Sequence, residues 1–159
     1  MIKFTVRSIL LLTFLITSIS ITSCKQKKTE NNSEINQIDL ATLEKEIELR
    51  LRDYENLLQN GDSIALGDMY MVDAEIIPST IGRENIIKSF GRMIRDSVTG
   101  SFITTDLWGN DDLLVEEGSG VWYQGKGLVV GRGKYLLVWK KDEGKWKILR
   151  DTWFPEEMN

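Results

Sequence analysis

The chain has 159 residues, of which 42% are apolar and 28% are charged, a composition that fits one compact domain. Its formal net charge of -4 argues against a nucleic-acid partner, because it gives no positive field to attract phosphates. The sequence contains no histidine, which excludes Ser-His-Asp and Cys-His catalysis and histidine-bound metals, so we expect no metal and no cofactor. The single cysteine cannot form an internal disulfide, so packing alone must stabilise the fold.

Residues 1–23 have the pattern of an export signal. Lys3 and Arg7 precede an uncharged stretch from residue 8 to residue 23. This stretch is shorter than the ~20 apolar residues of a membrane-spanning helix, and it becomes rich in Ser and Thr near its end, as signal peptides do before cleavage. We therefore expect residues 1–23 to be removed, which would leave a more acidic protein.

The segment ITSC, residues 21–24, resembles the lipobox of bacterial lipoproteins. The resemblance implies a diacylglyceryl thioether on Cys24, cleavage before it, and acylation of the new N-terminus by fatty acids such as palmitate. Several acyl chains hold a domain stably at a membrane, since each buried CH₂ contributes ~0.8 kcal/mol. The alternative is an ordinary signal peptide that contains a cysteine. Lys25 stands where the inner-membrane retention rule of some lipoproteins requires Asp, which favours the outer membrane of the cell envelope.

Residues 24–38 are predicted to form a flexible tether, since they are polar and show no periodicity. The domain is then expected to cover residues 39–159. Asp39 would cap a long helix that ends at Gly61, and Asp62 would cap a short helix reaching about Met69. The apolar positions of the long helix recur at three and four residues: Leu40, Leu43, Ile47, Leu51, Tyr54 and Leu58.

After the second helix, the pattern predicts a short strand over 73–79, stopped by Pro78, and a third helix over 82–97. Four long strands follow, at about 99–109, 112–124, 128–141 and 145–154. This order predicts an α+β domain whose helices cover one face of an antiparallel sheet. Glycines inside the strands favour bulges and strong curvature. A curved sheet around a long helix would form a cone with a pocket at its wide end.

This order of elements resembles the NTF2-like superfamily, in particular its SnoaL-like, ketosteroid-isomerase-like and DUF4440 branches. Three stretches carry the resemblance: residues 54–78 with a Gly-Asp break between helices, 81–90 with the helix start IGRENI, and 133–154 with a hairpin ending in W-x-I-x-x-D-x-W. None is a catalytic signature. Together they imply a cone of three N-terminal helices packed on a strongly curved antiparallel sheet.

The resemblance also implies which catalytic positions are filled. Ketosteroid isomerases use a helix tyrosine as oxyanion donor, an aspartate after the first strand as base, and a second acid in the sheet. Tyr54 falls at the tyrosine position, and the base position falls on Ile77, which cannot transfer a proton. The strand Lys134–Leu137 contains Tyr135 and no carboxylate. Isomerase chemistry of that kind is therefore not expected, and only Tyr54 carries over, as a hydroxyl lining the pocket.

Other acids remain as weak catalytic candidates. Alternation along the last strand puts Leu149, Asp151 and Trp153 on one side. If that side faces the cone, the pKa of Asp151 is raised and the group is usable as acid or base. If it faces outward, Asp151 is a surface group, solvated or paired with an arginine. Glu116 and Glu117 must face opposite ways, which makes one of them a second inward acid.

The five tryptophans all lie in the predicted strands. Most are expected to fill the core, because aromatic side chains bury large areas. Trp108 and Trp153, near strand ends, are predicted to lie at the rim of the pocket. The predicted ligand-binding residues are thus Tyr54, Trp108, Asp151 and Trp153.

Three functional hypotheses follow. The first is a lipid-anchored domain that binds a small apolar or amphipathic molecule in the cone without catalysis. The second is a SnoaL-like isomerase, cyclase or hydratase that uses an inward carboxylate. The third is a domain that forms a homodimer or docks a partner through its sheet. The missing base at Ile77 makes the first our preferred hypothesis.

Overall fold

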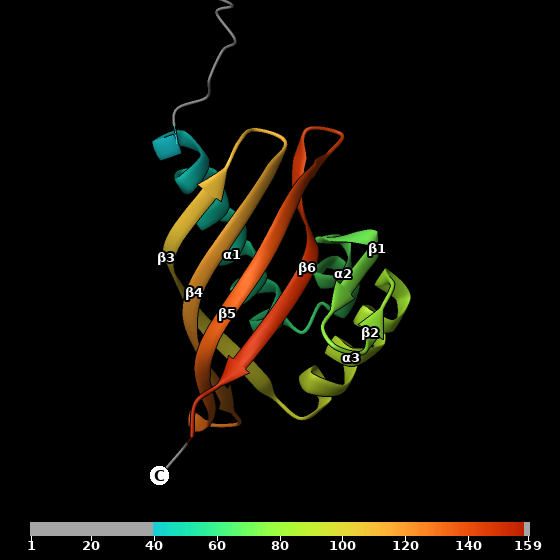
Figure 1. Ribbon diagram of the computed structural model, residues 1–159. Coiled ribbons are helices and arrows are strands. Elements are labelled where there is room, and N and C mark those ends of the chain that lie inside the picture. The colour runs from blue at the N-terminus through green and yellow to red at the C-terminus, as the bar shows by residue number, and fades with distance from the viewer. Residues whose placement is uncertain (1–39, 158–159) are drawn as a thin grey trace, which may run out of the picture. The chain divides into compact units, whose positions relative to one another are not determined.

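The computed structural model describes residues 40–157 (Figure 1). The predictions of a signal peptide, of a lipidation site at Cys24, of a tether and of a helix cap at Asp39 all concern residues outside the described range. Within residues 40–157, no helix is long and apolar enough to cross a membrane.

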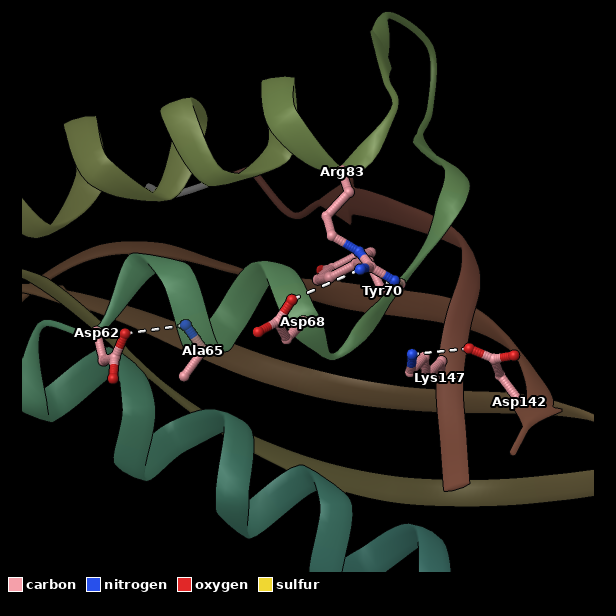
Figure 2. A network of polar contacts seen from close by, with 7 residues as sticks. All are labelled: Asp62, Ala65, Asp68, Tyr70, Arg83, Asp142 and Lys147. Carbon is pink, nitrogen blue, oxygen red and sulfur yellow. Dashed lines mark hydrogen bonds and ion pairs between the residues drawn. The ribbon is translucent and has the colours of Figure 1, made fainter. Parts of the chain in front are cut away.

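Three helices form where the sequence predicts them. The first, α1 (Leu40–Asn60), buries one stripe of side chains: Leu43, Ile47, Leu51, Tyr54 and Leu58. Leu40, in the first turn, is instead 43% exposed. The second, α2 (Ser63–Asp68), begins at Asp62, whose carboxylate accepts a hydrogen bond from the Ala65 amide at 2.9 Å (Figure 2). The third, α3 (Arg83–Arg95), buries Ile86 and Phe90.

The strands form one sheet of six, in the order β2-β1-β6-β5-β4-β3. Their bounds are β1 Tyr70–Ile76, β2 Thr80–Ile81, β3 Val98–Gly109, β4 Leu113–Gln124, β5 Leu128–Asp142 and β6 Lys145–Pro155. The four long strands match the predicted ranges closely. Adjacent members of this group are antiparallel, as expected.

Two features of the predicted cone need correction. The sheet is mixed, because β1 runs parallel to β6. The helices are not all N-terminal to the sheet, because β1 and β2 precede α3 in the chain. Strand β1 also begins three residues earlier than predicted, at Tyr70. The parallel pairing joins segments far apart in sequence, so the periodicity of neither segment reveals it.

The helix α1 crosses one face of the long strands, and α2 and α3 lie beside β1 (Figure 1). Two side chains of α1 bind the backbone of Phe102 on the edge strand β3. Arg52 donates to the Phe102 carbonyl, and Glu55 accepts from the Phe102 amide at 2.6 Å. Arg52 and Glu55 are themselves paired at 2.9 Å. The helix is thereby fixed to the edge of the sheet by directional bonds as well as by its apolar stripe.

Glycines in the long strands make room for aromatic rings. A Cβ atom at Gly118 would lie 2.1 Å from Cζ of Tyr135, its partner across β4 and β5, and one at Gly120 would lie 2.4 Å from Cδ1 of Phe102. The sheet is curved, as predicted, and its pairing is irregular at three places in β3–β6. The space left by the glycines accommodates Tyr135 and Phe102, which line a cavity between the sheet and the helices.

Candidate functional site: a cavity between the sheet and the helices

A cavity of about 150 Å³ lies between the sheet and the helices α1 and α3. Seven of its fourteen lining residues are aromatic, and five are aliphatic or methionine. Ser89 and Asp151 are the other two. The partly exposed lining residues mark its mouth, where α3 approaches the ends of β1, β4 and β6: Ile76, Ser89, Met93, Trp122, Asp151 and Trp153.

A bulge in β6 determines which side chains of that strand reach the cavity. The pairing of β5 with β6 shifts register between Val138 and Trp139. Before the shift, Ile148 faces inward; after it, Asp151 and Trp153 do. Simple alternation therefore fails for Leu149, which lies at the bulge and does not line the cavity. Because the bulge adds one residue, it brings an acid into an otherwise apolar wall.

Asp151 faces the cavity and not the solvent-exposed side of the sheet. Its Oδ2 accepts a hydrogen bond from the Tyr70 hydroxyl at 2.7 Å. Within residues 40–157, Oδ1 has no hydrogen bond and the carboxylate has no ion pair. Desolvation raises the pKa of Asp151 to about 6; the negative charge of Glu116 adds to the rise and the Tyr70 bond opposes it. At neutral pH Asp151 is therefore an ionised acceptor with one free oxygen.

The neighbouring arginine does not neutralise Asp151. Arg150 follows the other face of β6, where it donates to the carbonyls of Leu149 and Asp73 and lies 3.8 Å from Glu75. The alternative in which Asp151 forms a surface pair with an arginine is thus not what the structure shows.

Tyr54 lines the cavity, as its position on α1 predicts, and its hydroxyl interacts with that of Tyr70. Burial raises the pKa of both phenols, and the charge of Asp151 raises them further. Tyr54, Tyr70 and Asp151 therefore form a polar chain, and its two end members line the cavity. Both tyrosines remain neutral at any physiological pH.

Tyr70 is a site residue that the sequence analysis missed. It is fully buried at the start of β1. Arg83 of α3 fixes its backbone by donating from Nε and Nη2 to the Tyr70 carbonyl, at 3.0 and 2.8 Å, and lies 3.6 Å from Asp68 of α2 (Figure 2). Extending the predicted strand backward with a period of two would have put Tyr70 on the side of Ala74 and Ile76.

Glu116 is the inward member of its pair and is 0% exposed. Its Oε1 accepts from the hydroxyls of Thr104 at 2.6 Å and Tyr135 at 2.7 Å, and its Oε2 accepts from Nε1 of Trp139 at 2.7 Å. Burial raises the pKa of Glu116 despite these bonds. Glu116 does not itself line the cavity, but two of its hydrogen-bond donors, Tyr135 and Trp139, are lining residues. Glu117 faces the other way, 3.7 Å from Lys134.

Trp108 lies away from the cavity, in contrast to its predicted place at the rim. It is 49% exposed and is not among the lining residues. The cause is a bulge in β3, where the pairing with β4 shifts between Thr104 and Asp106. Phe102 faces inward before the bulge and Leu107 after it, so Trp108 points outward. Trp122, which was assigned to the core, lines the cavity beside Trp153.

The position that the resemblance assigns to a catalytic base holds no acid. Ile77 is 42% exposed, and its neighbour Ile76 is the side chain that lines the cavity. Among the described residues, no group of three or more Cys, Asp or Glu side chains is placed to hold a metal ion. Asp151 is therefore the one titratable acid that the cavity offers to a bound molecule.

No family model matches the sequence, and no curated protein matches it. Solved structures do resemble it. A variant of Rv3472, a protein of unknown function from Mycobacterium tuberculosis, aligns with a TM-score of 0.64 at 18% identity, over 74% of this chain and 79% of that one. An NTF2-like protein with a cystatin-like fold from Novosphingobium aromaticivorans aligns with a TM-score of 0.60 at 17% identity, over 72% of this chain and 83% of that one.

A third structure, a provisionally named scytalone dehydratase from Novosphingobium aromaticivorans, has a TM-score of 0.62 at 16% identity, over 74% of this chain and 87% of that one. Identities this low establish the fold alone. With its curved six-stranded sheet, its long helix and its cavity between them, the described part of the chain has the NTF2-like, or cystatin-like, cone fold.

Proposed function

We propose that this chain is a lipid-anchored domain that binds a small apolar or amphipathic molecule in its cavity, without chemical turnover. The observation that carries the proposal is a hollow of about 150 Å³ with aromatic walls and one ionisable acceptor. Ligand sites are typically apolar concavities in which a few polar groups fix the orientation of the ligand. Asp151 and Tyr54 are such groups here.

The size of the cavity limits the ligand. A cavity of roughly 150 Å³ holds about one six-membered ring. The polar chain of Tyr54, Tyr70 and Asp151 borders the cavity, and most of the other lining residues are apolar. A single-ring or short branched molecule with one polar group fits this distribution better than a uniformly apolar one.

Binding is tested by adding benzyl alcohol to the purified full-length protein and following amide chemical shifts. We expect shifts at lining residues. Ser89→Phe should abolish them, because its ring would occupy the mouth, whereas Lys88→Phe, on the exposed side of the same helix, should not. An unchanged spectrum of the unmodified protein, or undiminished binding by Ser89→Phe, would contradict the proposal.

The membrane part of the proposal is supported by the sequence at Cys24. We propose that acyl chains on Cys24 attach the protein to the cell envelope, more specifically to the outer membrane. Growth with a clickable palmitate analogue should label the unmodified protein and not Cys24→Ala. A Cys24→Ala protein that is labelled equally would contradict the anchor. That the domain forms a homodimer stays a prediction, which sedimentation of the purified protein tests.

A second candidate function is proton-transfer catalysis of the SnoaL-like kind, an isomerisation, cyclisation or hydration. The observation that favours it is Asp151, which lines the cavity and whose pKa is raised to about 6. The fold neighbour named for scytalone dehydratase is compatible with such chemistry. If this candidate is correct, the protein accelerates α-proton exchange of cyclohexanone in D₂O, and Asp151→Asn loses that acceleration. Exchange at the buffer rate would exclude the reaction for this probe and favour simple binding.

A further inference from the structure

Within residues 40–157, the cavity wall carries negative charge and no positive charge. Among the described residues, those that line it include no lysine or arginine, and Asp151 is its one charged side chain. Asp151 receives a single hydrogen bond, from a neutral phenol. The nearest arginine in sequence, Arg150, is engaged on the other face of the sheet with Glu75. A desolvated carboxylate without a cation is costly, so a ligand that supplies positive charge gains more there than a neutral ligand of the same shape.

Donors that would attract an anion or a carbonyl are partly withdrawn from the cavity. The hydroxyl of Tyr135 and the indole nitrogen of Trp139 both belong to lining residues, yet both donate at 2.7 Å to Glu116 behind the wall. The rings of these two residues, and not their polar atoms, are what the wall presents. Glu116, on the inward face of the same sheet, also adds negative charge near the cavity. Both effects disfavour an anionic ligand.

The aromatic rings stand nearly perpendicular to one another. Tyr54 and Phe102 meet at 79° with centroids 5.7 Å apart, Phe102 and Trp122 at 76° and 5.0 Å, and Trp122 and Trp153 at 70° and 6.0 Å. These three edge-to-face contacts join four rings of the cavity wall into one continuous aromatic cluster. The face of an aromatic ring carries negative potential and attracts alkylammonium groups, most strongly when they are desolvated. All four rings line the same cavity as Asp151.

We propose that the cavity selects a small organic cation, an alkylamine or quaternary ammonium compound of at most one-ring size, with its charged nitrogen at Asp151 and its carbon substituents against the aromatic rings. This rests on the proposed binding function and narrows it to one class of ligand. The carboxylate supplies the charge that the cation requires. The rings supply apolar contact and a favourable potential at the same point, which neither a phenol nor a fatty acid would use.

The test compares two pairs of nearly isosteric probes on the purified full-length protein at pH 8 by calorimetry and amide chemical shifts. The first pair is choline and 3,3-dimethylbutan-1-ol, which differ in charge and hardly in shape. The second pair is benzylamine and benzyl alcohol. We expect each cation to bind at least about tenfold more tightly than its neutral partner, as cation–π and charge contacts in a desolvated site predict.

Two variants locate the source of the preference. Asp151→Asn keeps the shape and an acceptor for the bond from Tyr70, and it should remove the preference for each cation over its neutral partner. Glu117→Gln is the matched control, since it removes one negative charge from the outer face of the same sheet; it should preserve the preference. Loss of the preference in Glu117→Gln as well would assign it to the general field of the protein and overturn the proposed site.

The outcomes separate this inference from the function on which it rests. If the neutral probes bind the unmodified protein as tightly as the cations, the cavity binds ligands and the cation inference is overturned. If no probe of either pair binds, both the inference and the proposed binding function fail. These comparisons use the unmodified protein, so they hold even if Asp151→Asn does not fold.

Discussion

Two carboxylates inside this molecule, Glu116 and Asp151, are bound in very different ways. Glu116 lies in the middle of β4, is fully buried, and accepts three hydrogen bonds from Thr104, Tyr135 and Trp139. Asp151 lies beside a bulge in β6, accepts one hydrogen bond from Tyr70, and lines the cavity. Neither forms an ion pair among the described residues. We call Glu116 the closed acid, because both of its oxygens accept hydrogen bonds, and Asp151 the open acid, because only one of its oxygens does so within residues 40–157.

The difference shows that burial alone does not make an acid available to a ligand. Desolvation raises the pKa of both groups. What separates them is how many of their lone pairs are already used. Glu116 orients two rings of the cavity wall and has little left to offer a ligand. Asp151 has most of its acceptor capacity unused.

The largest expected effect is on the closed acid. Glu116→Ala should lower the free energy of unfolding by about 3 kcal/mol or more, because two buried donors and a partly buried one lose their acceptor together. Urea denaturation measures the loss. Glu117→Ala, one residue away on the outer face, should change it by less than about 0.5 kcal/mol. Similar losses in the two variants would show that Glu116 is not the centre of a structural network.

The glycine opposite Tyr135 supports the same closed region. Gly118→Ala should cost about 2 kcal/mol, because the new methyl group would lie 2.1 Å from the Tyr135 ring and displace it from Glu116. Ser119→Ala is the control at the adjacent, outward position and should be nearly neutral in the same denaturation experiment. A Gly118→Ala protein as stable as the control would mean that the ring is free to move.

The open acid should behave in the opposite sense. Asp151→Asn should stabilise the protein at pH 7 by roughly 1 kcal/mol, since it removes a partly desolvated charge and keeps an acceptor for Tyr70. The pKa of Asp151 is about 6 in the folded protein against 3.8 ordinarily. Between these values the folded state binds more protons than the unfolded state, so the contribution of Asp151 to stability falls as pH rises through this window.

The measurement is therefore stability against pH for both proteins. The unmodified protein should lose stability relative to Asp151→Asn from pH 4 to pH 6, and the difference should be constant above about pH 7. A difference that does not depend on pH would place the pKa of Asp151 near its ordinary value and would make the group a solvated one.

The smallest expected effect concerns the single donor to Asp151. Tyr70→Phe should raise the pKa of Asp151 above about 6, because the hydrogen bond from Tyr70 favours the ionised form. Carbon-detected NMR titration of the carboxyl group measures the shift. Tyr54→Phe, which removes a hydroxyl with no direct bond to Asp151, should change the pKa less. A larger pKa shift in Tyr54→Phe would mean that Tyr54, and not Tyr70, donates directly to Asp151.

Much of the fold was predictable because local patterns specify it. The stripe from Leu43 to Leu58, the cap at Asp62 and the turns between the long strands each depend on residues near one another in sequence. The parallel pairing of β1 with β6 could not be predicted in this way, because it depends on tertiary packing between segments that are distant in sequence.

The site was predictable only where the periodicity of a helix or strand is unbroken. Tyr54 reaches the cavity on a regular helix, and Asp151 with Trp153 lies on the regular end of β6. A bulge in β3 turns Trp108 outward, and because of a bulge in β6 the cavity is lined by Ile148 and not by Leu149. Tyr70 was missed because β1 begins at residue 70, three residues before the start of the predicted strand. Bulges carry no clear signal in a single sequence, and each one reverses the faces beyond it.

The central claim is that Asp151 is open to a ligand in the cavity and Glu116 is closed. The most direct measurement is the carboxyl carbon shift of both residues during addition of benzylamine to the full-length protein at pH 8. We expect the Asp151 resonance to move with saturation and the Glu116 resonance to stay in place. A saturating shift at Glu116 with none at Asp151, or no shift at either, would contradict the account.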